Sequence, residues 1–155
     1  MALLLNESEQ LAVLLEVISV QGEWVFSHIA FQHYLPNEND FATWVEAYVD
    51  VYETDLRCLV YEIVNFAKDV STARKFAFEP QAEPSFEFRL QIGSVQPGPE
   101  VLVSVALDIK RILNLSMVAA YRENRISLQF LTDRVRVRRF SEQISLEVAK
   151  FVRLQ

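Results

Sequence analysis

Residues 44–52, WVEAYVDVY, alternate strictly between small apolar side chains and larger aromatic or acidic ones. Val45, Ala47, Val49 and Val51 form the small apolar set, and between them lie Trp44, Glu46, Tyr48, Asp50 and Tyr52. This period of two predicts a β-strand, because successive side chains of a strand point to opposite faces. We expect the small apolar face to pack on a core, which leaves the aromatic and acidic face to be explained.

Further strands are predicted on both sides of this one. Residues 10–20 and 24–35 are rich in β-branched and aromatic types, and Gln21-Gly22-Glu23 between them predicts a tight hairpin turn. Pro36–Asp40 is a polar loop that leads into the strand at 44–52. Later strand candidates lie at 75–78, 85–92, 100–107, 115–121 and 126–131, with a longer hairpin connection at 93–99.

Two segments have the period of an α-helix instead. From Leu56 to Val70 the apolar residues form one stripe, with Thr54 or Asp55 as the expected N-cap. Cys58, Glu62, Asn65 and Asp69 fall on the other side, so this helix is expected to dock on the sheet. The C-terminal segment fits a strand at 135–140 or a helix. We favour a helix over about 133–152, capped by Thr132 or Asp133, because the helical spacing persists longer.

These elements together predict an α+β fold, a mostly antiparallel sheet of about seven or eight strands with two amphipathic helices packed on it. The 155 residues are 51% hydrophobic and show no repeat or linker, so a single domain over 1–155 is expected. No apolar run is long enough to span a membrane, and the N-terminus has no signal-peptide pattern. The single cysteine, Cys58, fits a reducing compartment, and we expect a cytoplasmic protein.

Charge is divided unevenly along the chain. Residues 1–67 carry 11 acidic residues and one basic residue, Arg57, a net charge of −10, whereas residues 68–155 carry +4. The overall charge of −6 argues against direct binding of nucleic acid, for which basic domains are typical. An acidic half suits a basic partner. The alternative is an acidic surface that serves only solubility.

Sequence signatures of catalysis are absent, and we expect neither an enzyme nor a cofactor or metal site. The glycines are too scattered for a phosphate loop, and one cysteine cannot form a thiolate zinc site. His28 and His33 lie an odd number of residues apart on one predicted strand, hence on opposite faces. Glu46 and Asp50 would be about 13 Å apart, too far for a glycosidase pair. An enzyme that gathers carboxylates and His28 from distant segments remains an alternative.

Basic residues cluster only at Arg134, Arg136, Arg138 and Arg139. Such a run is able to bind phosphate. On a helix, however, these side chains spread over more than one side, and Glu142 and Glu147 follow them. We interpret the cluster as a solvated helix face with local ion pairs.

The composition most typical of binding lies in the opening stretch. Trp and Tyr are common anchors in protein interfaces, and carboxylates beside them would orient a basic surface. The candidate partner-binding residues are Glu38, Asp40, Trp44, Glu46, Tyr48, Asp50, Tyr52 and Glu53. One alternative is that another element covers the aromatic side chains. A second is that Trp44, Tyr48 and Tyr52 stack on a sugar in a small-ligand or carbohydrate-binding module.

Several spaced features resemble the WapI-type immunity proteins of bacterial polymorphic, contact-dependent toxin systems. They are the entry DFATW at 40–44, the helix with Leu56 and Phe66, the segment FAFEPQAEPSFEFRL at 76–90, the VLVSVAL strand, and the ISLQFLTD strand before the last helix. The marked positions are Trp44, Phe78, Glu79, Pro80, Phe88 and Thr132-Asp133. The resemblance implies no catalysis. It implies an inhibitor that binds a cognate toxin domain, often a basic nuclease.

Overall fold

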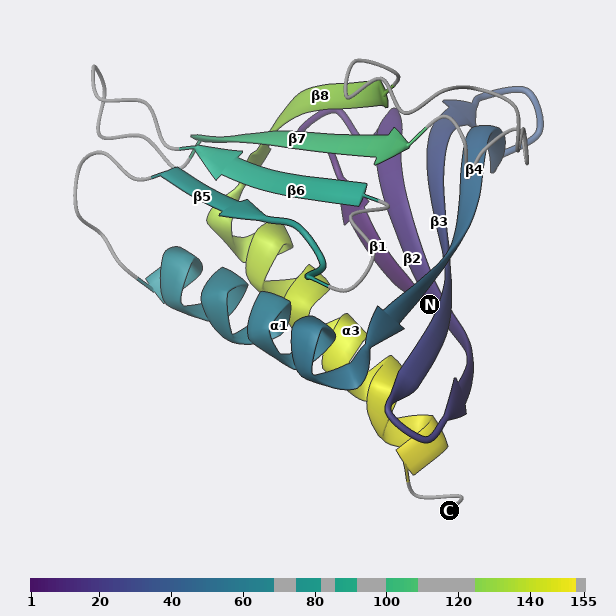
Figure 1. The fold of residues 1–155 in the computed structure, drawn as a ribbon. Helices are drawn as coiled ribbons and strands as arrows, with labels where there is room; N and C mark the ends of the chain where they lie inside the picture. Colours follow the sequence, from purple (N-terminus) through teal and green to yellow (C-terminus); the bar gives the residue numbers. More distant parts are fainter. Residues whose placement is uncertain (69–74, 82–85, 92–99, 109–124, 153–155) are drawn as a thin grey trace.

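A computed structural model describes residues 1–68, 75–81, 86–91, 100–108 and 125–152. The described residues form an α+β fold with eight antiparallel strands and two helices, as the sequence predicts. The strands form two four-stranded sheets rather than one (Figure 1). The first contains β1 (Ala2–Leu5), β2 (Leu11–Gln21), β3 (Trp24–Leu35) and β4 (Asp40–Tyr52), and the second contains β5 (Lys75–Phe78), β6 (Phe86–Gln91), β7 (Glu100–Asp108) and β8 (Arg125–Asp133).

The first sheet is a meander in which each strand pairs with the next along the chain. Gly22 and Glu23 connect β2 to β3, and Gln21 lies opposite Trp24. Gly22 has φ +61°, the left-handed conformation that the first central residue of a type II′ hairpin turn requires. This turn sets the register of β3 on β2 over the whole hairpin, apart from one bulge between Val17 and Ser19.

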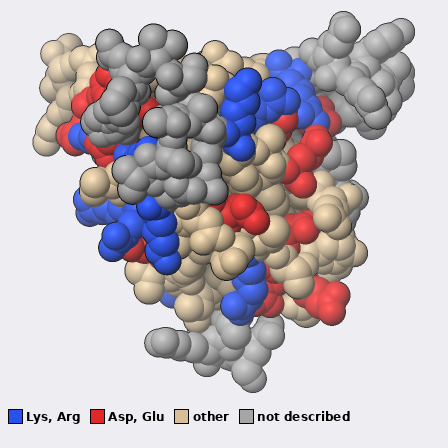
Figure 2. Space-filling model, turned by 90° about the vertical axis from the view of Figure 1, so that its left-hand side faces the viewer, with Lys and Arg blue, Asp and Glu red and all other residues tan. Residues whose placement is uncertain are grey.

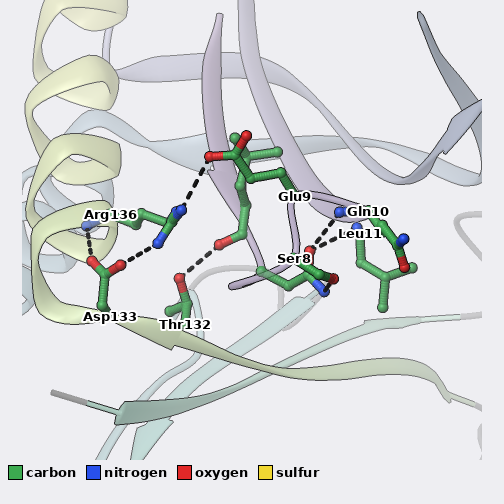
Figure 3. Close-up of polar contacts among 9 residues, drawn as sticks. Ser8, Glu9, Gln10, Leu11, Thr132, Asp133 and Arg136 are labelled. Atoms are coloured by element: carbon green, nitrogen blue, oxygen red, sulfur yellow. Dashed lines mark hydrogen bonds and ion pairs between the residues drawn. The ribbon is translucent and has the colours of Figure 1, made fainter. Parts of the chain in front are cut away.

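The two sheets meet where the turn after β1 reaches the end of β8 (Figure 3). The Thr132 hydroxyl donates to the Leu5 carbonyl at 2.6 Å, and the Glu7 amide donates to the Leu131 carbonyl at 3.0 Å. Arg136 contacts Asp133 and also Glu9, whose carboxylate oxygen lies 3.0 Å away. The first turn of the last helix is therefore fixed to both sheets.

Helix α1 (Glu53–Lys68) and helix α3 (Arg134–Val152) pack side by side, and α3 also packs on β1 and β2 (Figure 1). Of the two predicted caps, Thr132 and Asp133, it is Asp133 that caps α3, because its carboxylate accepts the Arg136 backbone N–H at 2.8 Å. The core between helices and sheets is mainly apolar, and its largest fully buried side chains include Phe31, Phe86, Phe140, Leu4, Ile29 and Leu56.

Several predicted boundaries differ in the structure. Helix α1 begins at Glu53, so the predicted caps Thr54 and Asp55 lie inside its first turn, and Asp55 instead accepts the Gln81 amide at 3.2 Å. Strand β1 was not predicted, because a short run of leucines carries no alternation. The predicted strand at 115–121, the connection at 93–99, and Asp69 and Val70 lie outside the described residues.

The interpretation of the arginine cluster as a solvated helix face with local ion pairs holds for Arg138 but does not extend to Glu147. Arg138 and Glu142 do form a local ion pair at 3.0 Å on the exposed side of α3. Glu147, however, is 5% exposed and contacts the Lys150 ammonium and the Met1 amino group. Burial alone would raise the pKa of Glu147, but the hydrogen bonds from Lys150 and from the amino group lower it below the ordinary value.

Candidate functional site

The outer face of β3 and β4 carries the surface that the sequence singled out, together with residues that it did not. In the β3–β4 register, Trp24 lies opposite Tyr52, Phe26 opposite Asp50, and His28 opposite Tyr48. We call this surface the acidic aromatic face, and its residues are Trp24, Phe26, His28, Glu46, Tyr48, Asp50 and Tyr52. The apolar residues between them on β4, Ala47, Val49 and Val51, are at most 1% exposed, so β4 has one core face and one outer face, as predicted.

The aromatic rings of this face form an ordered layer across the two strands. Tyr48 stacks on His28, with ring centroids 4.8 Å apart, and also packs against Phe26 at 5.9 Å. Trp24 packs on Tyr52 at 4.1 Å. Tyr48 nevertheless remains 48% exposed and Trp24 38% exposed. The layer is thus fixed by its neighbours before any partner binds, which lowers the entropy cost of binding.

The carboxylates of the face, and those at its two ends, make different contacts. The Glu46 carboxylate lies 2.8 Å from Nε2 of His28, and its side chain is half exposed. Asp50 lies on the same face, two residues beyond Tyr48. Asp40 accepts the Phe41 amide at 2.7 Å at the start of β4. Glu38 lies in the turn before β4, and Glu53 starts α1 and pairs with Arg57 at 2.6 Å.

Trp44 does not share the face to which the sequence assigned it. Phe31 pairs with Val45 whereas Gln32 pairs with Thr43, so Trp44 is the extra residue of a β-bulge in β4. Its ring packs against Phe31, with centroids 5.7 Å apart, and Phe31 is a fully buried core residue. Trp44 is 47% exposed, but it contacts the core side of the sheet. Trp44, Tyr48 and Tyr52 therefore do not form one stacking platform.

Sequence reasoning did not include Trp24, Phe26 or His28 among the candidate partner-binding residues. The sequence did carry a signal for their position, because the short loop at 36–39 brings β3 against β4. When the residues of β3 and β4 are paired one by one, starting from that loop, His28 comes to lie near Tyr48. The bulge at Trp44 shifts this pairing by one residue, and nothing in the alternation indicates the bulge.

An apolar groove lies elsewhere, between the two helices. It has a volume of about 460 Å³ and is lined by Leu56, Arg57, Val60, Tyr61, Val64, Ser145, Val148 and Ala149. Arg57 at its rim is paired with Glu53. Its lining among the described residues includes no carboxylate and neither histidine, which are the groups that an acid–base catalyst requires.

The charged groups of the second sheet and the helices are mixed in sign. Figure 2 shows the side of the molecule at the left of Figure 1, where Lys and Arg lie among Asp and Glu. Arg125, for example, contacts Glu79 and lies 3.2 Å from Glu87. These contacts raise the pKa of Arg125, through its hydrogen bond to Glu79 first and against the effect of burial.

Further features of the described residues bear on the requirements of a reactive cysteine, a metal site and a membrane-spanning helix. Cys58 is exposed on α1. Within the described ranges, no group of three or more His, Cys, Asp or Glu side chains is placed to hold a metal ion. Neither described helix has a long enough apolar stretch to cross a bilayer.

A scan against protein-family models, a search of curated proteins and a search of solved structures each gave no match to this chain.

Proposed function

We propose that this chain is a non-enzymatic inhibitor that binds and neutralises a basic protein domain through the acidic aromatic face. The observation that carries the proposal is the combination of exposed Tyr48 and Glu46 and partly exposed Asp50 on one ordered strand face with a net charge of −10 over residues 1–67. Exposed aromatic side chains supply contact area, and carboxylates around them accelerate association with a basic surface.

The resemblance to WapI-type immunity proteins supports the same role. On this proposal the chain acts in the bacterial cytoplasm, where it binds its cognate toxin domain, and a basic nuclease is the toxin class whose charge suits the face best. Glu38 lies before β4, Asp40 begins it and Glu53 follows it, so they extend the negative potential beyond the face at both ends. Neither direct binding of nucleic acid nor catalysis is part of the proposal.

The test is a pull-down of the tagged protein with the product of the gene directly upstream of its own, at low and at high salt. We expect stoichiometric capture that weakens as salt rises, because the contacts are between charges exposed to solvent. Absence of capture at low salt, or a neighbour whose expression is harmless to cells, would contradict the proposal.

Charge-reversal variants locate the surface. Glu46→Lys with Asp50→Lys should reduce capture at least about tenfold, because rim charges of this kind control association. The matched control is Glu7→Lys with Glu100→Lys, which changes the net charge equally at exposed positions away from the face. Equal losses for the two double variants would show that total charge, rather than this face, is responsible.

A second candidate function is a small-ligand-binding module, which the groove between α1 and α3 favours. Its volume of about 460 Å³ and its apolar lining suit an apolar ligand rather than a sugar. Titration with 1-anilinonaphthalene-8-sulfonate tests this candidate: saturable binding at one site that is lost in Val64→Arg would support it. Equal probe fluorescence with Val64→Arg and with the unchanged protein would contradict this candidate function.

A further inference from the structure

Strand β4 has one edge that no other strand occupies in the part of the chain that the structure describes. It lies at the end of the order β1-β2-β3-β4 and, among the described strands, pairs only with β3. It has 13 residues, and it is visible at the right of Figure 1. A long unpaired edge exposes backbone N–H and C=O groups that favour the addition of another strand.

The register shows which backbone groups point to that edge. In antiparallel pairs, each residue directs its N–H and C=O to one neighbouring strand only, and successive residues alternate. The Glu53 N–H donates to the Glu23 carbonyl at 2.9 Å, so the backbone groups of Glu53 point toward β3. Because the direction alternates along the strand, the backbone groups of every second residue before it also point toward β3: Val51, Val49, Ala47 and Val45. The intervening residues direct their backbone groups to the unpaired edge, and we call them the outward residues: Glu46, Tyr48, Asp50 and Tyr52.

The outward residues are the same four residues of β4 whose side chains form the acidic aromatic face. A strand that pairs antiparallel with this edge would place a side chain directly beside each of them, about 4.5–5.5 Å away between Cβ atoms. Backbone pairing and charge contact would thus be made by the same residues of the partner.

Pairing of two copies of this chain along the edge is disfavoured. An antiparallel pair of β4 strands centred on Tyr48 would place Glu46 of each copy opposite Asp50 of the other, and like charges directly opposite one another are destabilising. The bulge at Trp44 also breaks the regular edge toward its N-terminal end. The carboxylates therefore select against self-association and for a strand of opposite charge.

We propose that residues 45–52 of β4 accept an antiparallel strand from the basic partner, whose Lys or Arg side chains alternate with apolar ones. The basic residues would lie beside Glu46 and Asp50 on the outer face, and the apolar ones would extend the row of Val45, Ala47 and Val49 on the core side. This inference rests on the proposed function and adds the mode of recognition, strand addition.

The probe is a capped seven-residue peptide of alternating Lys and Val, added to the intact protein. In the free protein, the amide protons of the four outward residues should exchange rapidly with solvent, whereas those of Val45, Ala47, Val49 and Val51 should be protected by β3. On saturation with the peptide, the outward amides should become protected as well. Unchanged exchange of the outward amides at saturation would overturn the inference.

Two methylated forms of the peptide give a matched pair with identical charge. In the proposed antiparallel arrangement, the N–H groups of the Lys residues point to β4 and those of the Val residues point away. Backbone N-methylation at Lys should weaken binding at least about tenfold through lost hydrogen bonds, and methylation at Val should leave it within about twofold. Equal binding by the two forms, or greater loss on methylation at Val, would overturn the inference.

The same measurements separate this inference from the proposed function. If binding is salt-dependent and lost in Glu46→Lys with Asp50→Lys, but both methylated peptides bind alike, the acidic aromatic face is a binding surface and strand addition is wrong. If neither the peptide nor the upstream gene product binds at low salt, the proposed function fails together with the inference.

Discussion

The ring of Trp44 packs against Phe31, a core residue, although Trp44 belongs by simple alternation to the opposite face of β4. The bulge at Trp44 is the cause, since it adds one residue to β4 between two paired positions. Trp44 therefore covers part of the core, and Tyr48, with almost the same exposure, belongs to the acidic aromatic face.

Trp44→Ala and Tyr48→Ala should have different consequences. The first should lower the free energy of unfolding by about 1–2 kcal/mol, because it removes a ring contact and uncovers Phe31. It should leave binding of the Lys/Val peptide within about twofold. Tyr48→Ala should weaken that binding about threefold, because the ring would lie beside Lys side chains. Urea denaturation and calorimetric titration measure both quantities, and weaker peptide binding by Trp44→Ala would contradict this assignment.

Two fully buried hydroxyls offer a pair of opposite predictions. The Ser27 hydroxyl on β3 has no hydrogen-bond partner among the described residues, whereas Thr132 donates to Leu5. Ser27→Ala should raise the free energy of unfolding by about 1 kcal/mol, since a buried unpaired polar group is removed. Thr132→Val should lower it by about 1–2 kcal/mol, since the Leu5 carbonyl loses its donor. Urea denaturation of both variants checks the signs, and destabilisation by Ser27→Ala would show that its hydroxyl has a partner.

Removal of the cap of α3 should destabilise the fold. Asp133→Ala removes the acceptor of the Arg136 backbone N–H and should cost about 1 kcal/mol. Asp133→Asn should cost less, because an asparagine side chain accepts the same hydrogen bond. Thermal and urea denaturation of the two variants measure the difference. Equal costs would show that the ion pair with Arg136, rather than the cap, accounts for the effect of Asp133.

Glu147 should make stability depend on acid pH. Its pKa in the folded protein lies below the ordinary value of 4.5, despite burial, because Lys150 and the Met1 amino group donate hydrogen bonds to it. A carboxyl whose folded-state pKa is lowered adds stability above its unfolded-state pKa, and loses it as pH falls through the folded-state value. The free energy of unfolding should therefore fall below about pH 4.5.

The matched variant for this prediction is Glu147→Gln, which has no charge to titrate. It should be less stable than the parent at pH 7, and the difference should shrink as pH falls below about 4.5. Urea denaturation at several pH values between 7 and 3 provides the comparison. A difference that does not vary with pH would contradict the role of the ionised carboxylate.

Sequence periodicity predicted most of the described elements to within a few residues. The alternation in β4, β6 and β7, the stripe of α1 and the persistent helical spacing of α3 each reflect local backbone geometry. It also predicted that Glu46, Tyr48, Asp50 and Tyr52 share one outer face. Strand β1 and the start of α1 at Glu53 were missed, because a short leucine run has no period and Tyr52 is not a typical cap.

The sequence by itself therefore determined the α+β class, the mostly antiparallel arrangement of the strands and the face of β4 that carries the carboxylates, because period and turn chemistry act over a few residues. Only the tertiary structure decided that the strands divide into two sheets, that Trp44 leaves the face, that Glu147 is buried, and that Trp24, Phe26 and His28 join β4. These features depend on contacts between residues far apart in the chain, where register and packing select one arrangement among several that local preference allows.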